Sequence, residues 1–148
     1  MFIPNVWNAD LTAAGLEGSK FAPIIAGDDW TGDFTVLDSS GTVVDLTGAL
    51  VLMTVRDKVG GSILLTRRSD TNITGSSPAR KQIAIASDAT TGIFTLRFGR
   101  EASEVTLLEG IAGRVRIFDI RIVFADGTVE TFLRGRIDFT VTVTDPAR

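Results

Sequence analysis

The chain has 148 residues, of which 44% are hydrophobic and 22% are charged, and its formal net charge is −3 at pH 7. This size and composition predict one globular domain with a substantial core, and the acidic balance does not favour binding to nucleic acid. The sequence contains no His, Cys or Tyr. Disulfides, zinc sites built from His and Cys, and catalytic systems that need either residue are therefore excluded. General acid–base chemistry would fall to carboxylates or to one of the three lysines, so composition alone does not exclude an enzyme. We expect no cofactor and no metal.

Nothing in the chain indicates a membrane segment. No apolar run approaches the roughly 20 residues that a spanning helix needs, and residues 1–11 lack the basic and long apolar regions of a signal peptide. The absence of cysteine agrees with folding in a cytoplasm. Of the 15 basic residues, 12 are Arg and 3 are Lys. Arg suits desolvated interfaces better than Lys does, although a GC-rich coding genome explains the same bias.

Residues 1–20 differ from the rest of the chain. They mix isolated large apolar residues with Asn, Gly and Ala and show no convincing periodicity. The sequence predicts an extended N-terminal arm over residues 1–20 and a sandwich domain over residues 21–148. Two alternatives fit the arm: a strand that docks on the chain's own core, or an arm that docks on a neighbouring subunit. Large apolar side chains seek burial, so the candidate partner-binding residues are Phe2, Ile3, Val6 and Trp7.

Seven segments between residues 21 and 98 have the composition of strands, with turn-forming residues between them. They are residues 21–26, 30–37, 42–44, 49–56, 62–67, 81–86 and 92–98. Alternation with a period of two places Val51, Met53 and Val55 on one face of the strand and Leu50, Leu52 and Thr54 on the other. Trp30 begins one of these strands and is predicted to be a core residue.

Two polar segments invite functional interpretations. Residues 68–80 have the composition of an exposed, mobile loop. Asp28, Asp29 and Asp33 lie close together, but they lack the ligand spacing of a calcium loop, so roles in turns and at sheet edges are favoured. The pair Arg67 and Arg68 is explained by a solvated sheet face, as are Arg134 and Arg136; salt bridges to a partner are the alternative.

One helix is predicted over residues 100–109, which carry good helix formers and are followed by Gly110. Its apolar face would comprise Ala102, Val105 and Leu108, with Glu101 and Glu104 on another face.

The end of the chain carries the strongest pattern. Within residues 114–144, residues 117–124 and 136–143 show period-two alternation, and Asp126-Gly127 lies between them, a hairpin signal that predicts a type I′ turn. An antiparallel meander with one buried face is expected. With the preceding strands, this predicts an all-β fold: an antiparallel immunoglobulin-like or jelly-roll-like β-sandwich with one short helix and the extended N-terminal arm.

The order of these pieces resembles a known family. Residues 27–65, GDDWTGDFTVLDSSGTVVDLTGALVLMTVRDKVGGSILL, are followed by ATTGIF at 89–94 and by FDIRIVFADGTVETFLRGRIDFTVTVT. This arrangement is similar to β-sandwich structural proteins of tailed bacteriophages, in particular the N-terminal domain of upper baseplate and tail-fibre attachment proteins. The resemblance covers residues 27–144. It implies a module that docks on the virion and has no catalytic residues. Residues 145–148 carry no coiled coil or fibre segment, so we expect a small standalone virion component rather than a fibre carrier.

The resemblance predicts a structural component of a tailed-phage virion, assembled in the bacterial host cytoplasm. The expected role is a tail, baseplate or collar adaptor, with other virion proteins and copies of itself as partners. A capsid decoration protein is the alternative within this class. A carbohydrate-binding module is the alternative from another class, although sugar sites need exposed aromatic platforms and the chain has no Tyr. A hydrolase that uses two carboxylates is the least favoured reading.

Overall fold

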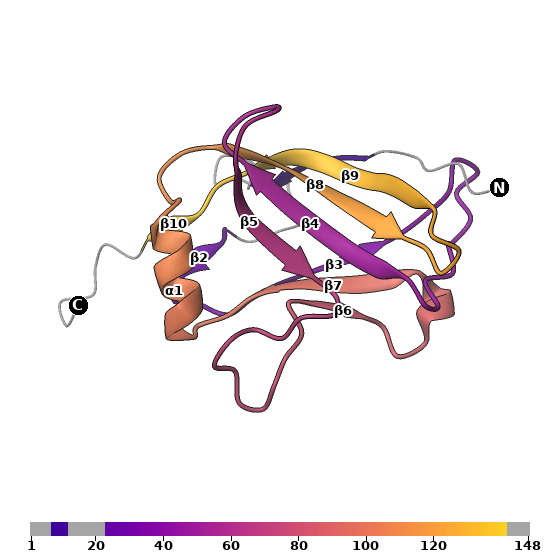
Figure 1. The fold of residues 1–148 in the computed structure, drawn as a ribbon, viewed down its shortest axis with the longest axis horizontal. Coiled ribbons are helices and arrows are strands. Elements are labelled where there is room, and N and C mark those ends of the chain that lie inside the picture. Colours follow the sequence, from indigo (N-terminus) through magenta and orange to yellow (C-terminus); the bar gives the residue numbers. More distant parts are fainter. Residues whose placement is uncertain (1–6, 12–22, 142–148) are drawn as a thin grey trace.

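The computed structural model describes residues 7–11 and 23–141, and these residues form ten strands and one α-helix (Figure 1). One sheet has five strands, in the order β1 (Trp7–Leu11), β9 (Val129–Ile137), β8 (Arg116–Val123), β4 (Leu50–Arg56) and β5 (Ile63–Arg68). A second sheet consists of β3 (Trp30–Thr35), β7 (Ile93–Phe98) and β6 (Ile83–Ile85). A third, short pairing joins β2 (Ile25–Ala26) to β10 (Thr140–Val141). The expected all-β, sandwich-like fold with one short helix is confirmed.

The core lies between the two larger sheets. Period-two alternation directs every second side chain of β4 inward, and the predicted face of Val51, Met53 and Val55 is the one that is buried. The opposing β7 supplies Phe94 and Phe98, among others. Ring contacts join the layers: the centroids of Phe94 and Phe132 on β9 lie 6.0 Å apart, in an edge-on arrangement. Trp30 is buried, as expected.

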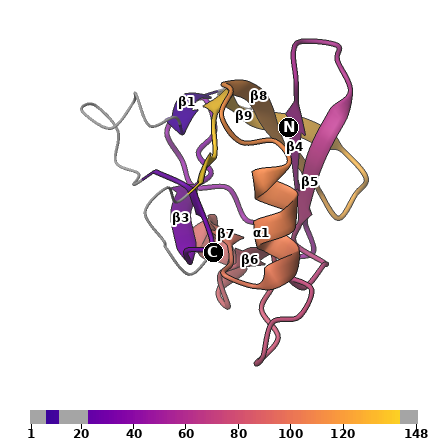
Figure 2. The same cartoon turned by 90° about the vertical axis from the view of Figure 1, so that its left-hand side faces the viewer.

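The helix α1 (Ala102–Glu109) closes one end of the sandwich. In Figure 2 it stands in front, with β3 on one side and β5 on the other. The helix ends at Gly110, as predicted, but its buried face was predicted wrongly. Ala102 is exposed and Val105 is half-buried, whereas Glu104 is buried beside Leu108. The reason is an ion pair that Glu104 makes in the interior, described below.

The hairpin between β8 and β9 is confirmed, but its turn is not type I′. Gly127 has φ 89°, whereas no described residue other than glycine has a positive φ, so Asp126 does not. The Gly127 N–H donates to Phe124 O at 2.8 Å, and the Phe124 N–H donates to Thr128 O at 2.8 Å. A type I turn followed by one left-handed glycine gives the three-residue loop that also suits twisted strands.

Two other strand predictions need correction. Residues 42–44 form no strand; Val43 makes only an isolated bridge to Leu37. The last strand does not continue an antiparallel meander, because β10 leaves the large sheet and pairs in parallel with β2. The turn over residues 88–91 is a short 3-10 helix, η2 (Ala89–Thr91), whose N-cap is Asp88.

Candidate functional site

The first described strand lies at one edge of the five-stranded sheet. β1 pairs in parallel with β9, so that Trp7 is opposite Leu133. Of the candidate partner-binding residues, Phe2, Ile3 and Val6 lie outside the described residues, and Trp7 begins β1. The described part of the predicted arm therefore forms a strand on the chain's own sheet. Contact between the arm and neighbouring subunits stays a prediction.

The outer face of the five-stranded sheet is rich in arginine over β4, β8 and β9. We call this surface the arginine face and define it as Arg56, Arg121, Arg134 and Arg136. It borders a depression with a volume of about 440 Å³. The strand register arranges the side chains of this outer face in three rows: Arg56, Ile117 and Arg136; Thr54, Asp119 and Arg134; and Leu52, Arg121 and Thr131.

The charges on the arginine face are only partly balanced. Arg56 Nη1 donates to Gly61 O at 2.7 Å. Arg121 Nε lies 4.0 Å from Asp119 Oδ1, and this aspartate is the one carboxylate among the described lining residues. Arg134 is exposed. Four arginines and one aspartate among the lining residues give this part of the outer face an excess of positive charge, on a chain whose net charge is negative. β1 borders it, with Asp10 in register with Arg136.

Four turns gather at the far end of the same strands, to the right in Figure 1. We call this the acidic end and define it as Asp38, Asp45, Asp88 and Asp126. Backbone contacts hold the turns together: the Leu46 N–H donates to Ala89 O at 3.0 Å. A Cβ on Gly48 would lie 3.2 Å from the Cβ of Ala125 in the β8–β9 hairpin.

Each carboxylate of the acidic end caps its own turn. The Oδ1 atoms accept from the backbone N–H of Ser40 and Thr42 (2.9 Å each), Thr47 (2.9 Å), Thr90 (3.1 Å) and Thr128 (2.9 Å). Hydrogen bonds from Thr47 lower the pKa of Asp45, and those from Thr128 lower the pKa of Asp126, because they favour the ionised carboxyl. Residues 36–49, 87–92 and 123–130 contain no Lys or Arg. The acidic end is therefore a fixed, negatively charged surface.

Exposed aliphatic side chains accompany both surfaces. Val43, Ile93 and Val129 lie at the acidic end and are 43%, 36% and 51% exposed. Val59 and Ile63, next to Arg56 at the β4–β5 hairpin, are 88% and 53% exposed. Arginine is enriched at protein–protein interfaces, and the buried centre of an interface is more apolar than the rest of the surface.

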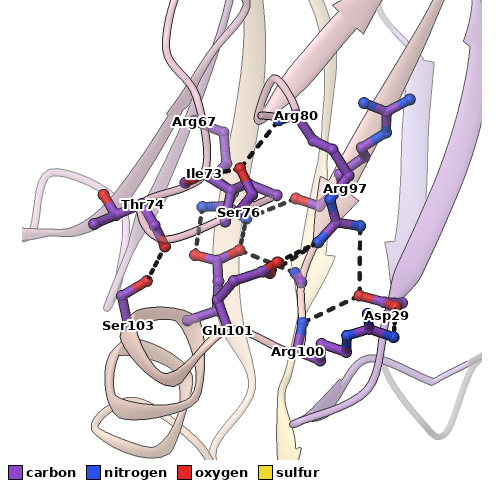
Figure 3. Close-up of polar contacts among 12 residues, drawn as sticks. Asp29, Arg67, Ile73, Thr74, Ser76, Arg80, Arg97, Arg100, Glu101 and Ser103 are labelled. Atoms are coloured by element: carbon purple, nitrogen blue, oxygen red, sulfur yellow. Dashed lines mark hydrogen bonds and ion pairs between the residues drawn. The ribbon is translucent and has the colours of Figure 1, made fainter. Parts of the chain in front are cut away.

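Buried charges stand at the α1 end (Figure 3). Arg67, predicted on a solvated face, is 1% exposed and forms an ion pair with Glu104; its Nη1 lies 2.9 Å from Oε2. The guanidinium also donates to Arg97 O at 2.7 Å and lies 4.5 Å from the ring centroid of Phe98. Glu104 accepts a further bond from the Gly99 N–H at 3.0 Å. Each charge is compensated by the other and by hydrogen bonds to the backbone, so this ion pair has a structural role.

The alternation that puts Leu65 inward also puts Arg67 inward, because the two residues are two apart on β5. The same applies to Arg116, which lies two residues before the inward-pointing Phe118. Arg116 is buried and forms an ion pair with Asp57. Strict alternation could have found both buried arginines.

The segment between β5 and β6 is not the wholly solvated loop that its composition predicts. Ile73 is 2% exposed, and Ser76 Oγ donates to its carbonyl oxygen at 2.7 Å. Arg80 Nη2 reaches Glu101 at 2.6 Å and thereby ties the segment to the start of α1. Arg80 also pairs with Asp29 at 3.5 Å. The segment is therefore held by the buried Ile73 and by the ion pairs of Arg80.

The aspartates near β3 serve local structure. The Asp29 carboxylate accepts from the Arg100 N–H at 3.1 Å, and Asp33 accepts from Thr95 Oγ1 across the strand pair at 2.6 Å. Within the described ranges, no group of three or more His, Cys, Asp or Glu side chains is placed to hold a metal ion.

Within the same ranges, no helix is long and apolar enough to cross a membrane. Neither a scan of the chain against protein-family models nor a search of curated proteins finds a match.

Proposed function

We propose that this chain is a non-enzymatic structural component of a tailed-phage virion, an adaptor in the tail, baseplate or collar that docks on neighbouring subunits. The observation that carries the proposal is the pair of oppositely charged surfaces, the arginine face and the acidic end. Both stand on a sandwich whose core is filled by the chain's own apolar side chains. Such a molecule acts by burying surface against its neighbours. The tailed-phage virion, as the particle in this proposal, is inferred from the resemblance to phage β-sandwich proteins.

The carbohydrate-binding alternative has less support. Trp30 is 5% exposed and packs against Phe98, with ring centroids 5.9 Å apart. It is therefore not available as a stacking platform for a sugar. The exposed large hydrophobic side chains among residues 23–141 are all aliphatic.

Deletion of residues 1–20 tests the proposal in particles. This deletion removes β1 but leaves the core, which residues 24–139 supply. We expect the truncated chain to retain β-sheet circular dichroism and cooperative unfolding but to be missing from purified particles that contain the full chain. Equal incorporation of both forms would contradict the role of the arm. Absence of the full chain from particles would contradict the proposed function itself.

A further inference from the structure

We propose that the arginine face of one copy binds the acidic end of a second copy, head to tail. The inference rests on the proposed function, because it names one of the partners through which such an adaptor would assemble.

Charge complementarity is the first argument. The arginine face brings four guanidinium groups together with Asp119, whereas the acidic end carries four aspartates in segments without Lys or Arg. Unlike charges on two separate surfaces steer association and suppress wrong orientations. A guanidinium binds a carboxylate through two parallel hydrogen bonds, and arginine is favoured at such contacts.

Preorganisation is the second argument. The carboxylates of Asp38, Asp45, Asp88 and Asp126 are already held by backbone N–H groups of their own turns. Each carboxylate retains acceptor capacity for an incoming guanidinium. Because the side chains are already ordered, binding costs less conformational entropy than it would with free side chains.

Apolar area is the third argument. Each surface adds exposed aliphatic side chains to its charges, with Val43, Ile93 and Val129 on one and Val59 and Ile63 on the other. Five of the seven exposed large hydrophobic residues among residues 23–141 lie at these two surfaces. The contact can therefore combine an apolar centre with charged surroundings, as protein interfaces do.

The separation of the two surfaces favours a head-to-tail contact. Leu50, at the acidic end of β4, is six residues from Arg56, or about 20 Å along an extended strand. Two unlike surfaces that lie apart on one molecule make a heterologous contact, which closes into a ring when the rotation between copies permits.

Native mass spectrometry and sedimentation velocity of the full chain test this contact. At low salt we expect self-association, with a dissociation constant that rises at least about tenfold when the salt is raised to about 0.5 M. The face variant is R121E/R134E. The end variant replaces all four aspartates by Asn, which preserves the turn caps, and adds S39K/S87K at exposed positions.

Each variant alone should fail to assemble, because its two surfaces then carry the same sign of charge. An equal mixture should assemble, since the acidic face of one variant meets the basic end of the other. The matched controls are K81E and D28K, which change exposed charges away from both surfaces and should assemble as the full chain does. Circular dichroism and thermal unfolding establish that every variant is folded.

A full chain that stays monomeric at low salt would overturn the inference. The inference would also be overturned if both folded variants assembled on their own. It would be overturned as well if their mixture did not assemble. If the monomeric chain is nevertheless found in particles, the proposed function stands and the self-contact alone fails.

Discussion

Arg67 and Arg134 stand on strands of the same five-stranded sheet, yet their surroundings differ completely. Arg67 points inward, is 1% exposed, and is held by Glu104, a backbone carbonyl and the ring of Phe98. Arg134 points outward from β9, beside a depression in which arginines outnumber carboxylates. The arginines of the chain therefore have two roles. Some stabilise the interior at the α1 end, and others form an open charged surface on the outer face.

The difference teaches that a basic pair in a strand has to be resolved residue by residue. Neighbouring residues of a strand point to opposite faces. Arg68, next to Arg67, is exposed and pairs with Asp70 at 2.8 Å. Hydrogen bonds from Arg68 hold the pKa of Asp70 well below its usual range. One of the two arginines is structural and the other belongs to the surface.

The largest expected effect comes from breaking the buried pair. Glu104→Leu leaves the Arg67 guanidinium buried without its carboxylate, and we expect the free energy of unfolding to fall by about 3–5 kcal/mol. Urea denaturation measures this change in the free energy of unfolding. The double variant R67M/E104L removes both charges and should recover most of that loss. A single variant as stable as the unaltered chain would show that the pair is not buried as described.

The outer face should behave in the opposite way. Arg134→Met removes an exposed side chain that has no charged partner among residues 23–141, so the free energy of unfolding should change by less than about 0.5 kcal/mol. Self-association should weaken at the same time. A loss of stability comparable to that of Glu104→Leu would erase the distinction between the two regions.

The smallest expected effect is the acid sensitivity of the acidic end. Asp45 and Asp126 have pKa values below the ordinary value of 3.8 in the folded chain. Their stabilising contribution is therefore complete above that pH and is lost as the pH falls through the lower folded values. The variant D45N/D126N does not titrate there, so its melting temperature should fall less than that of the unaltered chain between about pH 5 and pH 2.5. Parallel curves for the two proteins would contradict this.

Much of the fold was predictable from the sequence, because buried strands alternate with a period of two. That pattern groups Val51, Met53 and Val55 on one face of their strand, and this face is buried in the structure. The period-two pattern could not show that residues 42–44 pair only through a single bridge. Nor could it show that β10 leaves the large sheet to pair with β2, because strand pairing depends on tertiary contacts. The helix face was missed because propensity and spacing carry no information about a partner 37 residues away, the Arg67 that draws Glu104 inward.

The candidate surfaces were only partly predictable. Arg134 and Arg136 were visible as a basic pair, but the register of β4, β8 and β9 brings them beside Arg56 and Arg121. The turn aspartates were visible as turn residues, but their gathering at one end depends on how the turns pack.

The number of copies of this chain in each purified virion, determined by quantitative mass spectrometry, tests the central claim most directly. The account predicts a small fixed count that matches a ring on the tail axis. A count close to that of the major capsid protein would instead indicate a decoration protein on the shell. Absence from the particles would contradict the account.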